Sequence, residues 1–173
     1  MRLFALLLAV FAATPVLAQY DPFRPRYNDV PEEAPWKEDE VGLPKFPDPG
    51  NLTEIYVSAI ATNRYLIDRT SISVGKDQVV RFVLVVETSG GARNISFEGM
   101  RCKEQSWKLY ATGHRDGTWA PARISEWRPI ENKPVNRHHA AISRDLFCPN
   151  GSSINSSDEG VRALQAGKHP LAN

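Results

Sequence analysis

The residues from 78 to 87, QVVRFVLVVE, constrain the fold more than any other part of the chain. They are almost continuously apolar and rich in β-branched side chains, which favour extended structure. The run is too short to cross a bilayer, because a spanning helix needs about 20 apolar residues. It therefore predicts a central strand that is buried on both faces of a sheet.

Further runs with strand character lie on either side of it. They are separated by turn-forming stretches, among which Ser89-Gly90-Gly91 is typical of a hairpin. In 106–112 the apolar residues Trp107, Leu109 and Ala111 alternate with Lys108 and Tyr110, which predicts one face for each set. The expected strands besides 78–87 are 53–60, 65–74, 92–98, 106–112 and a short one that begins at Trp119. An antiparallel meander is the simplest topology for 78–87, 92–98, 106–112 and the strand that begins at Trp119.

The C-terminal third carries two helical patterns. Residues 137–147 have apolar residues at helical spacing and end before Pro149, which cannot continue a helix. Ser156 and Glu159 form a capping box, and Gly167 is a candidate C-cap. The sequence predicts an α+β fold with a single antiparallel sheet of about 5–6 strands, one or two C-terminal helices and one disulfide.

The first 18 residues have the pattern of a cleavable secretory signal peptide. Arg2 supplies the positive charge, an apolar stretch follows, and the small residue Ala18 marks the expected cleavage site. Gln19 stands where a lipoprotein would have cysteine, so we expect no lipid anchor. No later run is long enough for a membrane span. The predicted location is the periplasm, with secretion as the alternative.

Export makes a disulfide the expected state of Cys102 and Cys148, the two cysteines of the chain. The chain-entropy model assigns a loop of this length about 4 kcal/mol of stabilisation. A redox site would need Cys-x-x-Cys spacing, and a zinc site would need histidines paired with the thiols. Neither pattern is present.

Residues 19–50 form an arm rich in proline and acidic residues. Seven of the 13 prolines lie in this arm, which excludes a regular helix or a central strand. Its second half, from Trp36 to Phe46, has apolar side chains that could attach it to the domain surface. We expect one globular domain at 51–166 and a flexible tail at 167–173.

Charge excludes one class of function. The chain has 21 Lys and Arg and 20 Asp and Glu, and loss of Arg2 with the signal peptide leaves 20 of each. A nucleic-acid-binding protein would show a basic stripe, so no nucleic-acid partner is expected.

Residues 114–130 combine arginine and tryptophan in a way that is typical of binding surfaces. Arginine stacks on indole rings and binds carboxylates through two parallel hydrogen bonds. Such a surface could hold an acidic sugar or a peptide carboxylate. The alternative is that the tryptophans anchor the core and the arginines cover their edges. The candidate binding residues are Trp107, Tyr110, Arg115, Trp119, Arg123, Trp127 and Arg128.

No pattern of catalytic or metal-binding residues stands out. The adjacent His138 and His139 would point about 100° apart on a helix, so we expect no metal site and no cofactor. Hydrogen bonding near a helix start is the preferred role for them. A glycosidase-type carboxylate pair would come from Glu98, Asp116 or Glu126, but their spacing selects no pair.

Several short stretches together resemble the CNP-one-like family of small exported bacterial proteins. They are WKEDEVGLPKFP (36–47), NRYLID (63–68), FEGMRC (97–102), KLYATG (108–113), DGTW (116–119), SEWRPI (125–130) and RDLFCPN (144–150). The resemblance covers about residues 36–166. It implies an envelope protein, without implying any catalytic residue, since the family has no established biochemical activity.

Three functional hypotheses follow. The leading one is a non-catalytic envelope domain that binds an envelope polymer or a protein partner through the Trp/Arg surface. The second is a cell-wall polymer hydrolase that uses a carboxylate pair. The third is a structural protein whose proline-rich arm docks on a partner.

Overall fold

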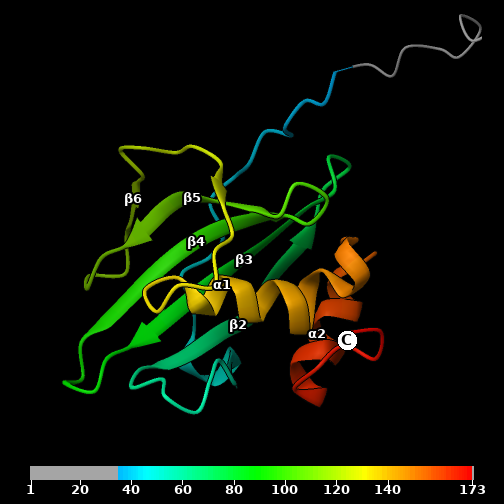
Figure 1. The fold of residues 1–173 in the computed structure, drawn as a ribbon. Coiled ribbons are helices and arrows are strands. Elements are labelled where there is room, and N and C mark those ends of the chain that lie inside the picture. The colour runs from blue at the N-terminus through cyan, green and yellow to red at the C-terminus, as the bar shows by residue number, and fades with distance from the viewer. Residues whose placement is uncertain (1–34, 173) are drawn as a thin grey trace, which may run out of the picture. The chain divides into compact units, whose positions relative to one another are not determined.

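The computed structural model describes residues 35–172, in which Trp36 begins the compact unit. The predicted signal peptide and the first part of the predicted arm lie outside the described residues. Figure 1 shows a single sheet with two helices in the C-terminal part. The predicted α+β class is confirmed.

The sheet follows the chain order β1-β2-β3-β4-β5-β6, and all its neighbouring strands are antiparallel. The short strand β7 pairs with β5 next to β6. The predicted meander is therefore correct. The strands are β1 (Leu52–Ile55), β2 (Arg64–Val74), β3 (Val79–Glu87), β4 (Arg93–Arg101), β5 (Ser106–Gly113), β6 (Trp119–Pro121) and β7 (Arg128–Pro129).

The predicted central strand is β3, which pairs with β2 on one edge and with β4 on the other. Residues 79–85 are all buried. The strand expected at 53–60 is shorter, because a turn in which the Ala61 amide donates to the Ser58 carbonyl follows β1. Tyr56 and Ile60 consequently lie in an exposed loop, with 72% and 73% of their surfaces accessible.

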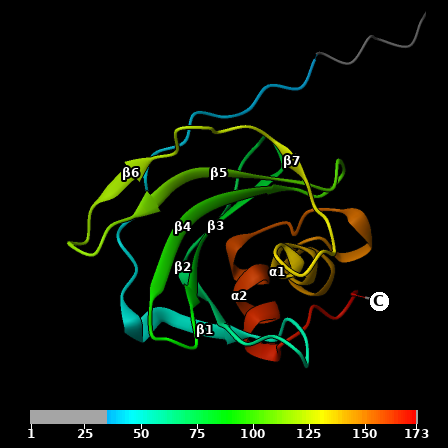
Figure 2. The same ribbon diagram turned by 60° about the vertical axis from the view of Figure 1, so that its left-hand side comes forward.

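The helices cover one face of the sheet, called here the inner face. In Figure 2 the sheet curves around α1 (Arg137–Ile142) and α2 (Ser157–Ala166). The core between them is apolar and includes Ile67, Phe82, Leu84, Met100, Ile142, Phe147 and Ile154. Gly160 permits this close packing, since a Cβ there would lie 2.8 Å from Ile154 Cδ1.

The ends of the helices follow the predicted signals. The Ser156 side chain accepts a hydrogen bond from the Glu159 amide, and Gly167 closes α2 with a φ of 74°. Helix α1 continues into a π-helical segment, Ser143–Phe147, and a short 3-10 turn, Pro149–Gly151, follows Cys148. Another 3-10 turn, Pro49–Asn51, leads into β1.

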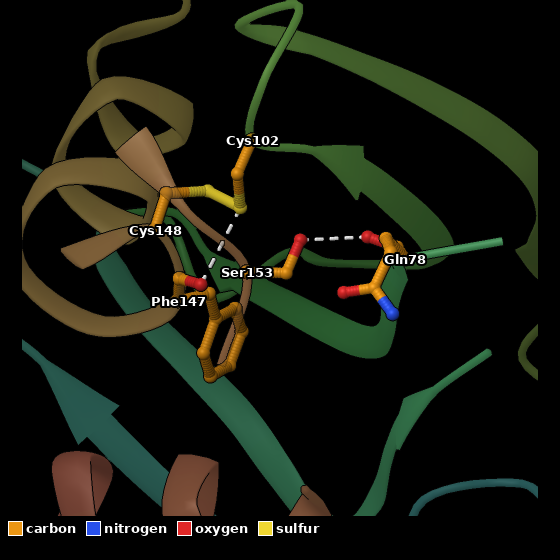
Figure 3. Close-up of a disulfide and its surroundings, with 5 residues drawn as sticks. All are labelled: Gln78, Cys102, Phe147, Cys148 and Ser153. Carbon is orange, nitrogen blue, oxygen red and sulfur yellow. Dashed lines mark hydrogen bonds between the residues drawn. A yellow bond between two sulfur atoms is a disulfide. The ribbon is translucent and has the colours of Figure 1, made fainter. Parts of the chain in front are cut away.

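The predicted disulfide joins Cys102 to Cys148, with their Cα atoms 5.2 Å apart. It links the end of β4 to the end of the π-helical segment. Figure 3 shows it beside Phe147, and shows Ser153 donating a hydrogen bond to the Gln78 carbonyl at 2.7 Å. These two links attach the C-terminal loop to one end of the β3–β4 pair, where Val79 is opposite Arg101.

The other face of the sheet, called here the outer face, is covered without a helix. Residues 36–48, called here the strap, have no regular secondary structure and run along this face. Figure 2 shows the blue strap on the side of the sheet away from the helices before it reaches β1. A second apolar cluster of Val83, Phe97 and Ala111 lies on this face, with Val41 of the strap packed against it.

Candidate functional site

The residues of the predicted Trp/Arg surface do not share one face of the sheet. Trp107 lies on the inner face, where its ring stacks on His139 with centroids 3.8 Å apart. Tyr110, Trp119 and Trp127 contact the strap. The arginines of the set are exposed, and the Arg128 guanidinium lies 5.9 Å from the Trp107 ring centroid. These three arginines of the predicted set are Arg115, Arg123 and Arg128.

A β-bulge explains part of this distribution. Glu98 is opposite Leu109, whereas the preceding residue, Phe97, is opposite Ala111. Tyr110 is therefore an extra residue in β5, and beyond it the side chains change face. Ala111 joins the Phe97 cluster on the outer face, so the expected alternation of Trp107, Leu109 and Ala111 on one face is wrong at Ala111.

The best-defined polar contact of the outer face is at Glu38 of the strap. Its carboxylate accepts hydrogen bonds from Lys108 Nζ at 2.8 Å, the Tyr110 hydroxyl at 2.7 Å and Trp127 Nε1 at 3.3 Å. Burial alone would raise the pKa of Glu38, but these donors outweigh burial and lower it. Burial and the bond to Glu38 raise the pKa of Tyr110. The sheet thus presents three converging donors to one carboxylate.

Trp36 of the strap binds beside Glu38. The Arg101 guanidinium lies 3.7 Å from the centroid of the Trp36 ring, and Trp127 meets that ring edge-on with centroids 6.1 Å apart. Trp36 Nε1 donates to the Asp77 carbonyl at 3.0 Å. The indole is therefore held by a cation, an aromatic ring and a backbone acceptor.

Asp39 continues the attachment to the β2–β3 turn. The Asp39 amide donates to the Asp77 carboxylate at 2.9 Å, and the Asp77 amide donates to the Asp39 carboxylate at 3.2 Å. Arg81, only 5% exposed, forms a buried ion pair with Asp77. Burial would raise the pKa of Asp77, but the bonds from Arg81 and the backbone lower it. Each aspartate thus donates its backbone amide to the carboxylate of the other. The arrangement resembles paired strands, except that side-chain carboxylates accept the bonds in place of backbone carbonyls.

The second half of the strap is held mainly by rings. Trp119 Nε1 donates to the Pro44 carbonyl at 3.0 Å, and the Phe46 ring lies 5.3 Å from the Trp119 ring. Gly113 makes this approach possible, because a Cβ there would lie 2.9 Å from both Phe46 and Ile95. Together these contacts make the outer face a site for an extended segment with acidic and aromatic side chains.

The inner face contains a buried polar pair under α1. His139 Nε2 lies 2.8 Å from Glu98 Oε2, and the Ser96 hydroxyl donates to Glu98 Oε1 at 2.6 Å. Burial would raise the pKa of Glu98, but the bonds from His139 and Ser96 outweigh it and lower the pKa. His138 stacks on Tyr65 with centroids 5.1 Å apart. The contact of His139 with Glu98 agrees with the hydrogen-bonding role expected near the helix start, whereas Nδ1 of His138 is buried without a hydrogen-bond partner among residues 35–172.

The carboxylates considered for a hydrolase occupy unlike environments. Glu98 is buried on the inner face with both oxygens bonded. Asp116 is exposed in the β5–β6 turn and accepts hydrogen bonds from Thr118. Glu126 is exposed in the loop before β7. No contact links any two of the three among residues 35–172, and no observation favours a carboxylate-pair hydrolase.

Sequence reasoning missed the residues that hold the strap from the sheet side and from the turn. Arg101, Lys108 and Asp77 were not candidates, and neither was Glu38. The alternation in β5 did indicate that Lys108 and Tyr110 lie on the same face of that strand. The sequence could not show that Glu38 binds these two side chains, because 70 residues separate Lys108 from Glu38.

Membrane-spanning helices and metal-binding groups were considered for the described residues. Between residues 35 and 172 no helix is long and apolar enough to cross a membrane. In the same range no group of three or more His, Cys, Asp or Glu side chains could hold a metal ion.

Comparison with known proteins identifies relatives of the whole unit. The chain is 28% identical to cryptic neisserial protein 1 of Neisseria gonorrhoeae, over 87% of this chain and 85% of that protein. No solved structure matches the chain significantly. Residues 31–165 match the CNP1-like family, a range that includes the strap, the sheet, α1 and all but the last residue of α2. The chain therefore belongs to the CNP1-like family, which is the family that its motifs resemble.

Proposed function

We propose that the protein is an exported, non-catalytic interaction module whose outer face binds an extended acidic and aromatic segment. The strap is the intramolecular occupant of that face. The observation that carries the proposal is the carboxylate of Glu38, which accepts hydrogen bonds from three different side chains of the sheet and its edge loop. Charge-assisted bonds that converge in this way are typical of recognition sites for carboxylates.

The location belongs to the same proposal. Cleavage after Ala18 and a periplasmic location follow from the signal pattern of the first 18 residues. Pairing of both cysteines of the chain in one disulfide supports an oxidising compartment.

An intramolecular occupant affects how a partner segment would bind. The strap is joined to β1 by only the short turn Pro49–Asn51, so its local concentration at the outer face is high. A segment from another protein would bind only the fraction of molecules whose face is vacant, and its apparent dissociation constant would rise accordingly. Weakening the strap should then strengthen binding of a separate segment.

A peptide-binding experiment tests this competition. The probe is a fluorescent peptide of residues 35–47, titrated into the oxidised mature protein and into its Trp36→Ala/Glu38→Gln double variant. We expect the variant to bind the peptide at least about tenfold more tightly, because the substitutions remove strap contacts and leave the face intact. Adding Trp127→Ala to the double variant should abolish this binding. An acidic glycan serves as competitor, to test the other predicted partner class.

The matched control is Glu40→Gln. Glu40 is exposed and has no hydrogen bond or ion pair among the described residues, so this variant should bind the peptide as weakly as the wild-type protein. A double variant that stays folded but does not bind the peptide would contradict the proposal, and the strap would then be a permanent structural element.

A further inference from the structure

A cavity of about 240 Å³ lies beside α1, on the helical side of the sheet. Its walls come from the loop after β1, the loop before α1, and α1 with its π-helical extension. It is lined by Val57, Ser58, Asn132, Arg137, Ala141 and Arg144. The cavity is separate from the outer face and shares no residue with the strap contacts.

Each polar side chain that lines the cavity can donate a hydrogen bond. The Ser58 hydroxyl is buried and has no hydrogen-bond partner within residues 35–172. A buried hydroxyl without a partner costs about 1–3 kcal/mol. Arg137 is half-buried and has no ion pair in the described part of the chain. Ser58 and Arg137 therefore gain most from an added acceptor.

Arg144 supplies the second guanidinium. It pairs with Asp145 through Nε and Nη2, so its Nη1 amino group keeps its donors for another acceptor. None of the residues that line the cavity is acidic. Two guanidinium groups, a hydroxyl and the Asn132 amide thus face a space that contains no negative charge from the lining residues.

The π-helical segment enlarges this site. A second cavity of about 390 Å³ shares Asn132 and Arg144 with the first and reaches Ser143, Gln105 and the disulfide. The disulfide at its end is drawn in Figure 3. The Cys148 amide donates to the Ser143 carbonyl at 2.8 Å, which widens the turn, and such turns are frequent at functional sites. A ligand bound at Arg137 and Arg144 could therefore extend past the disulfide.

We propose that the cavity beside α1 binds a small oxyanion, a phosphate or carboxylate group, between Arg137 and Arg144. Arginine presents paired N–H donors that match both groups. The Ser58 hydroxyl and the Asn132 amide complete the donor set. This inference is independent of the strap, and either proposal can fail without the other.

The test is an NMR titration of the oxidised, isotope-labelled mature protein with inorganic phosphate and, separately, with acetate at constant ionic strength. We expect saturable shifts of the Ser58, Asn132 and Ala141 amides, with saturation at about 10 mM or below. Arg137→Gln should raise the dissociation constant at least about tenfold, because it removes the one cation of the cavity without an ion pair. The anion that binds more tightly identifies the ligand class.

The control is Arg162→Gln, which removes an exposed arginine of α2 that lines neither cavity and should change nothing. Ser58→Ala provides a second variant if Arg137→Gln does not fold, and it should weaken binding about fivefold through loss of one hydrogen bond. Shifts that do not saturate, or that are equal in wild-type and Arg137→Gln proteins, would overturn the proposal.

Discussion

The two faces of one sheet are covered by different means. Helices and apolar side chains cover the inner face, where Phe82, Ile142 and Phe147 are fully buried. A segment without regular structure covers the outer face, and most of its contacts are directional: ion pairs, hydrogen bonds, and cation–π and edge or tilted ring contacts. The inner cover depends on buried area, and the outer cover depends on a few well-placed groups.

This difference has a physical consequence. Burial of apolar area is shared among many residues, so the inner face forms one cooperative unit with the helices. The strap instead has separable points of attachment at Trp36, Glu38, Asp39 and Phe46. Local release of the strap should need much less free energy than unfolding of the core.

The largest difference between the faces should appear on truncation of a phenylalanine. Phe82→Ala on the inner face should lower the free energy of unfolding by about 4 kcal/mol, because it leaves a cavity in a closed core. Phe46→Ala in the strap should cost about 1–2 kcal/mol, because Phe46 is half-buried. Urea unfolding of both variants measures the contrast. Equal losses would show that the strap belongs to the same cooperative unit.

A smaller effect should appear on acidification of the inner face. Burial and the neighbouring His139 lower the pKa of His138 to about 4 from its ordinary value of 6.5. Between these two values the unfolded chain binds a proton that the folded chain does not, so stability falls as the pH falls. From pH 7.5 to 4.5 this contributes a loss of about 2–3 kcal/mol.

The variant His138→Phe isolates that contribution while it keeps a ring on Tyr65. Its stability should decline less than that of the wild-type protein over the same pH range, as measured by urea unfolding at several pH values. His114→Gln, which removes an exposed histidine from the β5–β6 turn, should leave the wild-type decline unchanged. An unaltered decline in His138→Phe would rule out His138 as its source.

The smallest effect concerns the carboxylate of the strap. Glu38→Gln should cost about 1–2 kcal/mol at pH 7 through loss of charge-assisted bonds. The pKa of Glu38 is lowered in the folded state, so the stabilisation is present above the ordinary value of 4.5 and is lost as the pH falls through the folded value. Unfolding of Glu38→Gln and Glu40→Gln at pH 7 and at acidic pH measures this. A deficit in Glu38→Gln that persists at low pH would contradict the assignment.

Sequence patterns predicted the inner half of the molecule well. The continuous apolar run of β3 and the caps of α2 are local signals, and each depends on residues close in the chain. The disulfide followed from the number of cysteines and the expected compartment. These features needed no knowledge of long-range contacts.

The candidate site was predicted less well for a physical reason. Face assignment in a strand depends on strict alternation, and the single extra residue Tyr110 reverses it for Ala111 and beyond. Trp107, Trp119 and Trp127 are close in sequence, but the sheet and its edge loop place Trp107 apart from the other two. The buried Arg81–Asp77 pair gives no periodic signal.

The distance along the chain between the strap and its binding groups has a consequence for folding during synthesis. Glu38 and Trp127 are 89 residues apart, and chains grow at about 5–20 residues per second, beginning at the N-terminus. The strap therefore exists for roughly 4–18 s before the last of its binding groups is made. During that interval Trp36 and Phe46 have no intramolecular partner on the finished sheet, and a chaperone that binds aromatic segments would find them available.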